Sequence, residues 1–145
     1  MDPEPDHVLV PFDGSPLADD ALAHALAVFD CRVTVLNVIT PLDADMAEGG
    51  LLEPDAERKA AARERAERLV ERARDEAATK GRTVETAIET GDPADAIVAS
   101  VEDHDVDHVV MGGHGGRRGP IARRLLGTVA TAVLGDVDVT VTVVR

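Results

Sequence analysis

Short apolar segments alternate with amphipathic segments along the whole 145-residue chain. Strands are expected where aliphatic and β-branched residues cluster, at residues 7–12, 32–39, 83–89, 107–111 and 137–144. Between them, apolar residues recur at the three- and four-residue spacing of helices. Strands that alternate with helices form a parallel sheet with helices on both faces. We therefore predict a Rossmann-like α/β fold, built as one domain over residues 1–145.

Two of the expected helices begin with recognisable capping signals. Ser15 is a candidate N-cap with Pro16 at the first helical position, and Asp92 and Pro93 repeat this arrangement later in the chain. Helices are expected from residue 16, at 54–80, from residue 93 and at 126–134.

The strand patterns also indicate which strands lie at the edges of the sheet. Strands buried on both faces are continuous apolar runs, whereas partly exposed edge strands alternate apolar and polar residues. The segments at 7–12 and 107–111 are nearly continuous, while those at 83–89 and 137–144 alternate. With the third and fifth strands at the edges, right-handed crossovers give an open sheet of order 3-2-1-4-5.

A glycine-rich segment follows the fourth expected strand and leads into the last expected helix. Glycines let backbone N–H groups approach an anion, and a helix N-terminus adds partial positive charge. The segment is therefore a candidate phosphate-binding loop. The alternative is a flexible surface turn followed by arginines on a solvated helix face. The glycines are Gly112, Gly113, Gly115 and Gly116, with His114 between them, and the arginines are Arg117, Arg118, Arg123 and Arg124.

The expected strand order places this loop opposite a second polar feature. The order reverses between strands one and four, and ligands of open α/β sheets bind at the carboxyl ends of the strands at such a point. Asp13 ends the first strand and the glycine loop ends the fourth. We predict a ligand crevice between them. For Asp13 the alternative is that it caps its own turn.

The charge balance restricts the partners of the chain. With 15 Lys and Arg against 28 Asp and Glu, the net charge is −13, which argues against nucleic-acid binding because phosphates would be repelled. The chain has only two lysines, Lys59 and Lys80, and it has two phenylalanines but no tyrosine or tryptophan. Because salt screens the repulsion between the excess negative charges, the composition favours a halophile with a salt-rich cytoplasm.

No segment approaches the roughly 18 continuous apolar residues of a membrane span, and the acidic, proline-rich N-terminus favours a cytoplasmic protein.

Six segments spread along the chain form a recognisable set of motifs: VLVPFDGS at 8–15, VLNV at 35–38, GDPADAI at 91–97, MGGHG at 111–115, LLGTV at 125–129 and VTVTVV at 139–144. Together they resemble the universal stress protein family along essentially the whole chain. The fold of that family is a five-stranded α/β sandwich, and the resemblance implies a homodimer formed through the C-terminal strand. One branch of the family binds ATP.

The ATP-binding branch implies a role for individual residues. Asp13 would bind the ribose or assist a metal such as Mg²⁺, the backbone of Val38 would meet the adenine edge, and Gly112 would lie beside the ribose. The phosphates would be held chiefly by backbone N–H groups and by the Thr128 hydroxyl, and the residues concerned are Gly115, Gly116, Gly127, Thr128 and Val129. The alternative for Thr128 is a plain helix N-cap, a role that is compatible with phosphate binding. The full candidate set is Pro11, Asp13, Val38, Met111, Gly112, Gly113, His114, Gly115, Gly116, Gly127, Thr128 and Val129.

The loop departs from the spacing of the ATP-binding branch, which is G-x-x-G, nine residues, then G-S or G-T. Taking Gly113 and Gly116 as the pair leaves ten residues before Gly127, and taking Gly112 and Gly115 leaves eleven. The extra residues either bulge outward from unchanged anchor points or disturb the phosphate cradle.

The sequence thus favours a universal stress protein that acts as an ATP-binding stress-response or regulatory module. No nucleophile and base pair stands out and no Walker-type Gly-Lys-Ser/Thr is present, so no catalytic residue is assigned. One alternative is an enzyme of a related fold that cleaves ATP or transfers adenylyl groups. The other is a dimeric interaction protein of the same family whose altered loop does not bind ATP.

The last expected strand supports the homodimer independently. Residues 137–144 contain no proline and no lysine, the residues that commonly protect an exposed edge strand. Its unpaired backbone groups would be satisfied by the same strand of a second copy, related by a two-fold axis.

Overall fold

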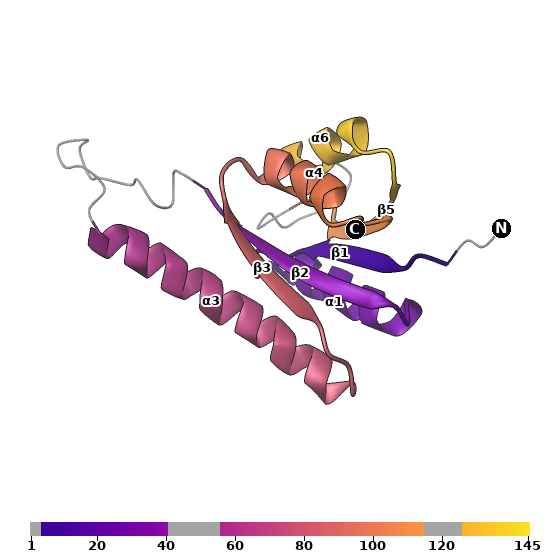
Figure 1. Ribbon diagram of the computed structural model, residues 1–145, viewed down its shortest axis with the longest axis horizontal. Helices are drawn as coiled ribbons and strands as arrows, with labels where there is room; N and C mark the ends of the chain where they lie inside the picture. The colour runs from indigo at the N-terminus through magenta and orange to yellow at the C-terminus, as the bar shows by residue number, and fades with distance from the viewer. Residues whose placement is uncertain (1–3, 41–55, 115–125) are drawn as a thin grey trace.

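The computed structural model, which describes residues 4–40, 56–114 and 126–145, contains one five-stranded parallel sheet. Its strand order is β3-β2-β1-β4-β5 (Figure 1). The predicted α/β class and the predicted order 3-2-1-4-5 are therefore confirmed. The strands are β1 (His7–Pro11), β2 (Arg32–Ile39), β3 (Glu85–Thr90), β4 (His108–Gly112) and β5 (Thr140–Val144).

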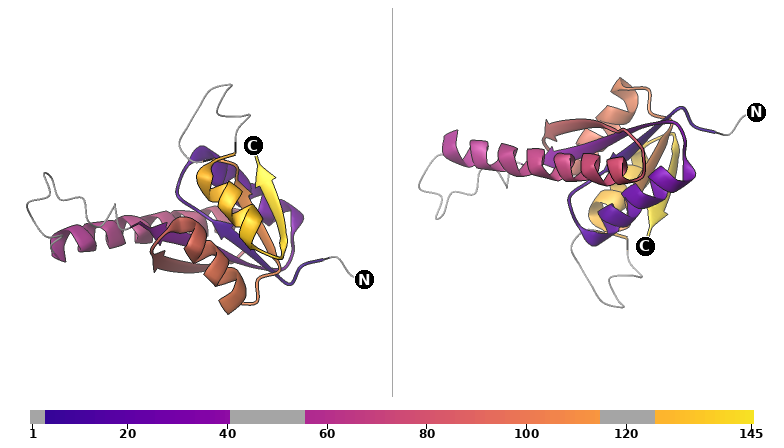
Figure 2. Two further views of the ribbon diagram at one scale, coloured as in Figure 1. Left: turned by 90° about the horizontal axis from the view of Figure 1, so that it is seen from above. Right: turned by 90° about the horizontal axis from the view of Figure 1, so that it is seen from below.

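Helices cover both faces of the sheet. Figure 2 shows α4 and α6 over one face in its left view, and α1 and α3 over the other face in its right view. The described helices are α1 (Pro16–Val28), α3 (Ala56–Thr79), α4 (Pro93–Asp103) and α6 (Thr128–Asp136). None of these described helices is long and apolar enough to cross a membrane.

The core is divided between the two faces by the alternation of the central strand. Successive side chains of a strand point to opposite faces. Val8 and Val10 accordingly pack with α1 and α3, whereas Leu9 packs with α4 and α6. All three side chains are buried, so β1 is the sheet's interior strand, as its continuous apolar sequence predicts.

Both predicted helix caps are confirmed. The Ser15 hydroxyl accepts a hydrogen bond from the Ala18 N–H at 3.3 Å, at the start of α1. The Asp92 carboxylate accepts one from the Asp95 N–H at 3.0 Å, at the start of α4. Each cap satisfies one of the N–H groups that a first helical turn leaves without a partner.

Some predicted boundaries are wrong by two or three residues. The last helix begins at Thr128 instead of residue 126, because the Gly127 N–H bonds the Gly113 carbonyl and keeps that part of the chain extended. The last strand begins at Thr140 instead of residue 137, because the Val137 N–H caps α6 by donating to the Val133 carbonyl. The third strand begins at Glu85 instead of residue 83. The predicted start of the long helix at residue 54 lies outside the described residues.

Candidate functional site

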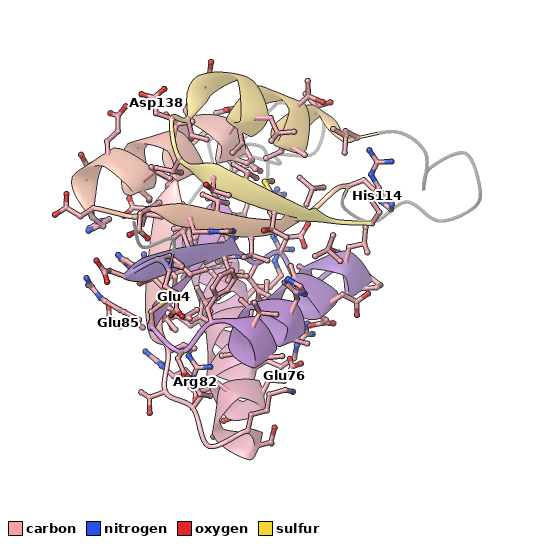
Figure 3. All side chains as sticks on the ribbon, turned by 90° about the vertical axis from the view of Figure 1, so that its right-hand side faces the viewer. Glu4, Glu76, Arg82, Glu85, His114 and Asp138 are labelled. Atoms are coloured by element: carbon pink, nitrogen blue, oxygen red, sulfur yellow. The ribbon has the colours of Figure 1, made fainter. Side chains whose placement is uncertain are left out.

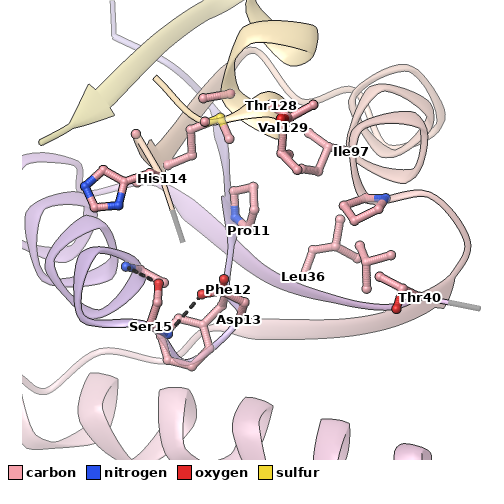
Figure 4. A pocket seen from close by; sticks show the side chains of 18 residues that line it. Pro11, Phe12, Asp13, Ser15, Leu36, Thr40, Ile97, His114, Thr128 and Val129 are labelled. Atoms are coloured by element: carbon pink, nitrogen blue, oxygen red, sulfur yellow. Dashed lines mark hydrogen bonds between the residues drawn. The ribbon is translucent and has the colours of Figure 1, made fainter. Parts of the chain in front are cut away.

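A pocket of about 390 Å³ lies at the carboxyl edge of the sheet, where the strand order reverses between β1 and β4 (Figure 4). The ends of β1, β2 and β4 and the starts of α1, α4 and α6 contribute its lining. Figure 3 shows one lining residue, His114, at the opposite end of the sheet from Glu85 and Asp138. The pocket thus has the position that the sheet topology predicts for a ligand site.

Ten of the twelve candidate residues line this pocket. Gly115 and Gly116 lie outside the described residues. The ten are Pro11, Asp13, Val38, Met111, Gly112, Gly113, His114, Gly127, Thr128 and Val129.

The β2 side of the pocket offers backbone hydrogen-bonding groups. The Phe12 N–H donates to the Leu36 carbonyl at 2.8 Å, so Leu36 directs its backbone groups towards β1. Alternate residues of a strand point the same way, and Val38 therefore directs its N–H and C=O to that side as well. Since β1 ends at Pro11, opposite Leu36, these groups face the pocket. An N–H and a C=O side by side can pair with the edge of a planar base.

The pocket also has lining residues that the sequence did not predict, and most of them are apolar. The missed lining residues are Phe12, Ser15, Ala18, Leu36, Thr40, Pro93, Ile97 and Ala130. Thr40 directly follows β2, and Ile97 lies near the start of α4 (Figure 4). Pro93 is the first residue of α4. The signal that could have found them is the predicted strand order, since strand two lies beside strand one and its carboxyl end meets the same edge.

Asp13 caps its own turn and also lines the pocket. One carboxylate oxygen accepts a hydrogen bond from the Ser15 N–H at 2.9 Å (Figure 4). The turn depends on Gly14, whose φ of +83° is strained for other residues. Asp13 is exposed and is the only carboxylate among the described lining residues. Both roles weighed for Asp13, turn capping and a position at the ligand site, are therefore compatible.

The metal-binding capacity of the pocket is small. The described residues contain no group of three or more His, Cys, Asp and Glu side chains that could hold a metal ion. Mg²⁺ commonly binds through one or two carboxylates together with substrate phosphates and water. Asp13 could supply that single carboxylate, so the pocket suits a metal that arrives with a phosphorylated ligand.

Gly112 and Gly113 allow close packing at the end of β4. A Cβ on Gly112 would lie 2.9 Å from the Leu17 Cβ and 3.2 Å from its backbone carbonyl carbon. A Cβ on Gly113 would lie 3.2 Å from the Val143 side chain. These glycines therefore let α1 and β5 approach β4 where the glycine-rich segment begins.

The two ends of the glycine-rich segment are joined at its base. The Gly127 N–H donates to the Gly113 carbonyl at 2.6 Å, and the Gly113 N–H donates to the Val144 carbonyl at 2.8 Å. These bonds fix the start of α6 against β4 and β5, whatever the length of the segment between. They also occupy the Gly127 N–H, which the family resemblance implied as a phosphate donor.

The start of α6 differs from the starts of α1 and α4. The N-cap is Gly127, not Thr128, and no side chain of a described residue caps the helix. The Gly127 carbonyl accepts from the Thr131 N–H and hydroxyl, at 3.0 and 2.9 Å. The N–H groups of Thr128 and Val129 have no acceptor within the helix and carry its positive dipole end to the pocket. Such a helix start binds anions.

His114 provides a further polar group beside this helix start. Its Nδ1 atom is buried and has no hydrogen-bond partner among the described residues. A Cβ on Gly127 would lie 3.2 Å from the His114 Cα, so the two residues are in close contact. Burying such a nitrogen without a partner is unfavourable, and a bound ligand or water would relieve the cost.

The Rossmann-like sheet, the pocket where its strand order reverses and the uncapped start of α6 together define a ligand-binding α/β protein. This chain belongs to the universal stress protein family, whose family model matches residues 5–145. The predicted family resemblance is confirmed.

Solved structures agree with this assignment. The hypothetical protein MJ0577 is 30% identical, with 96% of this chain and 94% of that chain covered and a TM-score of 0.79. A universal stress protein in complex with cAMP is 24% identical, with 99% and 98% covered and a TM-score of 0.67. A family member from Arabidopsis thaliana with AMP bound is 19% identical, with 97% and 91% covered and a TM-score of 0.68. The last two similarities concern the fold. No curated protein matches the sequence.

Proposed function

We propose that this protein is a universal stress protein that binds an adenine nucleotide, with ATP as its ligand, and acts as a stress-response or regulatory module. The observation that carries the proposal is the uncapped start of α6, which brings two N–H groups without helical acceptors to the same pocket as the Val38 backbone. Relatives of the same fold bind cAMP and AMP. The pocket thus combines a phosphate-binding end with a base-binding end.

In the proposed complex, the adenine lies against Val38 and the apolar start of α4. Asp13 faces the ribose, or a Mg²⁺ ion that accompanies the phosphates, and Gly112 lies beside the sugar. The phosphates approach the N–H groups of Thr128 and Val129, with the Thr128 hydroxyl and His114 as further contacts. Gly115 and Gly116 are proposed phosphate contacts on the family resemblance.

Titration calorimetry in molar KCl tests this proposal with ATP, AMP and GTP. Adenine offers a donor and an acceptor that match the Val38 C=O and N–H, and guanine reverses that pattern at the same edge. We expect ATP and AMP to bind and GTP to bind more weakly. The absence of binding by both adenine nucleotides would support the dimeric interaction protein. Steady ATP turnover by the purified protein would support the enzyme.

We also propose a homodimer through β5. The Val144 carbonyl accepts from Gly113 on the β4 side, so Val141 directs its backbone groups to the open edge of the sheet. Val141→Pro removes an outward N–H while the N–H groups that face β4 are kept. Light scattering should show a dimer for the wild type and a monomer for this variant. A monomeric wild type, or a dimer that persists in the variant, would contradict the β5 interface.

We further propose a cytoplasmic protein of a halophile, and the net charge of −13 supports the halophilic part of this proposal. Salt screens repulsion between like charges, so the melting temperature should rise as KCl increases from low to molar concentration. A melting temperature independent of KCl would contradict the halophilic proposal.

A further inference from the structure

Helix α3 contacts the turn that carries Asp13, although α3 contributes no residue to the lining of the pocket. A Cβ built on Gly14 would lie 2.7 Å from the Leu69 Cδ2 atom, so Leu69 packs directly on this turn. Figure 4 shows Phe12, Asp13 and Ser15 on the side of the pocket that faces the α3 ribbon. The outer side of the turn is therefore an interface with α3.

Arg72, one turn along α3 from Leu69, contacts three successive parts of the chain around Asp13. Its guanidinium carbon lies 5.3 Å from the centroid of the Phe12 ring. Its Nη2 atom donates to the Gly14 carbonyl at 3.4 Å and to the Asp19 carboxylate at 2.8 Å. Arg72 thus joins the end of β1, the glycine turn and the first turn of α1.

These contacts bear on local geometry more than on overall stability. The side chains of Arg72 and Asp19 are 48% and 38% exposed, and ion pairs this exposed contribute little to the stability of a protein. Gly14, by contrast, is the residue with the most backbone freedom, at the position next to Asp13. Phe12 is buried, and its carbonyl accepts from the Asn37 amide at 2.8 Å, which makes it a fixed support for the guanidinium.

We infer that Arg72 is a positioning residue for the nucleotide site, holding the turn of Asp13 in its binding geometry from the α3 side. This inference rests on the proposed nucleotide binding. Arg72 does not touch the ligand. It restricts the conformations of Gly14 and so raises the fraction of molecules in which Asp13 faces the ribose. A ligand that needs one conformation binds in proportion to the population of that conformation.

The test compares Arg72→Gln with Arg63→Gln, using AMP as the titrant in calorimetry. Arg63 lies on the same helix and pairs with Glu67 at 3.4 Å, at similar exposure and away from the pocket. We expect R72Q to weaken AMP binding roughly fivefold, the size that exposed ion pairs and cation–π contacts support. R63Q should bind AMP as the wild type does, and both variants should melt within about 2 °C of each other because both lost pairs are exposed.

Amide exchange in the free protein gives a second readout. The Ser15 N–H is held by the Asp13 carboxylate, so its exchange should be faster in R72Q than in R63Q. Asp19→Asn should weaken AMP binding by a smaller factor, and adding it to R72Q should have no further effect, because both changes remove one interaction.

The outcomes separate the two claims. If the wild type does not bind AMP, the proposed function is overturned and the positioning role falls with it. If the wild type binds AMP but R72Q binds it equally well, or if R63Q weakens binding to the same extent, only the role of Arg72 is overturned. Unchanged Ser15 exchange in R72Q would also contradict that role.

Discussion

Helices α4 and α6 pack on the same face of the sheet and begin at the same pocket, yet their first turns present different chemistry. At α4, the Asp92 side chain satisfies the Asp95 N–H, and Pro93 has no N–H to offer. At α6, Gly127 has no side chain, and the N–H groups that follow it are left for another acceptor. One helix start is closed by its own sequence, and the other is open.

This difference indicates how the two ends of the pocket are used. The start of α4 contributes Pro93 and Ile97, which are apolar and suit the flat face of a base. The start of α6 contributes N–H groups and the positive end of a helix dipole, which suit a phosphate. The orientation proposed for the nucleotide follows from this asymmetry.

The largest expected effect is at the open helix start. Gly127 has an ordinary φ of −72°, so the space around it, not its backbone conformation, excludes a side chain. A Cβ there would lie 3.2 Å from the His114 Cα and 3.3 Å from the Gly113 carbonyl. Gly127→Val should therefore displace the start of α6 and weaken ATP binding about tenfold or more, a loss of about 1.4 kcal/mol or more.

Gly135→Val is the matched control for this change. Gly135 lies on the same helix, and a Cβ there would meet nothing within 4 Å. Calorimetry should give the wild-type ATP affinity for this variant. Equal affinities for the two variants would remove the open helix start from the site.

The next largest effect is an increase in the free energy of unfolding when ATP is bound. A ligand that binds only the folded state stabilises it, by about 2.7 kcal/mol when its free concentration is 100 times Kd. ATP at such a concentration should raise the melting temperature of the wild type. Adenosine at the same multiple of its own Kd should give the same shift, but at a higher concentration, because it lacks the contacts at α6. An equal potency of adenosine and ATP would contradict the phosphate contacts.

Removal of the Asp92 cap of α4 should lower the stability of the protein and leave its affinity for ATP unchanged. Asp92→Ala leaves the Asp95 N–H without its acceptor, which typically costs about 1 kcal/mol and roughly 3 °C in Tm. Because α4 supplies apolar contacts and no anion contact, ATP affinity should stay at the wild-type value. Thermal melts and calorimetry on the same sample check both statements. A marked loss of ATP affinity would mean that the start of α4 also binds phosphate.

The smallest effect is expected for Thr128→Ala. Its side chain does not cap α6, so the melting temperature should change little. Loss of one hydroxyl contact to a phosphate should weaken ATP binding by a few-fold, in line with about 1 kcal/mol for an ordinary hydrogen bond. The two variants should thus show opposite effects, since Asp92→Ala loses stability and Thr128→Ala loses ATP affinity. A large fall in Tm for Thr128→Ala would contradict this division.

The sequence predicted the fold well because the fold depends on strong, local patterns. Continuous apolar runs marked the interior strands, and alternation marked β3 and β5 as the edges. The misplaced boundaries involve residues whose state is decided by distant partners. Gly127 is held extended by Gly113 from the far end of the glycine-rich segment, and Val137 closes α6 although its β-branched side chain favours a strand.

The candidate site was predicted in part. Asp13 and the residues around Gly112 could be predicted because they directly follow the first and fourth strands, which the sequence pattern identifies. Thr40 and Ile97 were missed because their place in the pocket depends on how β2 and α4 converge in space. The contribution of Arg72 was also beyond the sequence pattern, since on α3 it is one of several arginines on a charged helix.

Backbone amide chemical shifts during parallel titrations with ATP and adenosine show directly where phosphate binds. The Val38 amide should respond to both ligands, because both carry adenine. The amides of Thr128 and Val129 should respond strongly to ATP and weakly to adenosine, and the capped Asp95 amide should change little with either. Equal responses of Thr128 to the two ligands, or an ATP response centred on Asp95, would contradict a phosphate site at the start of α6.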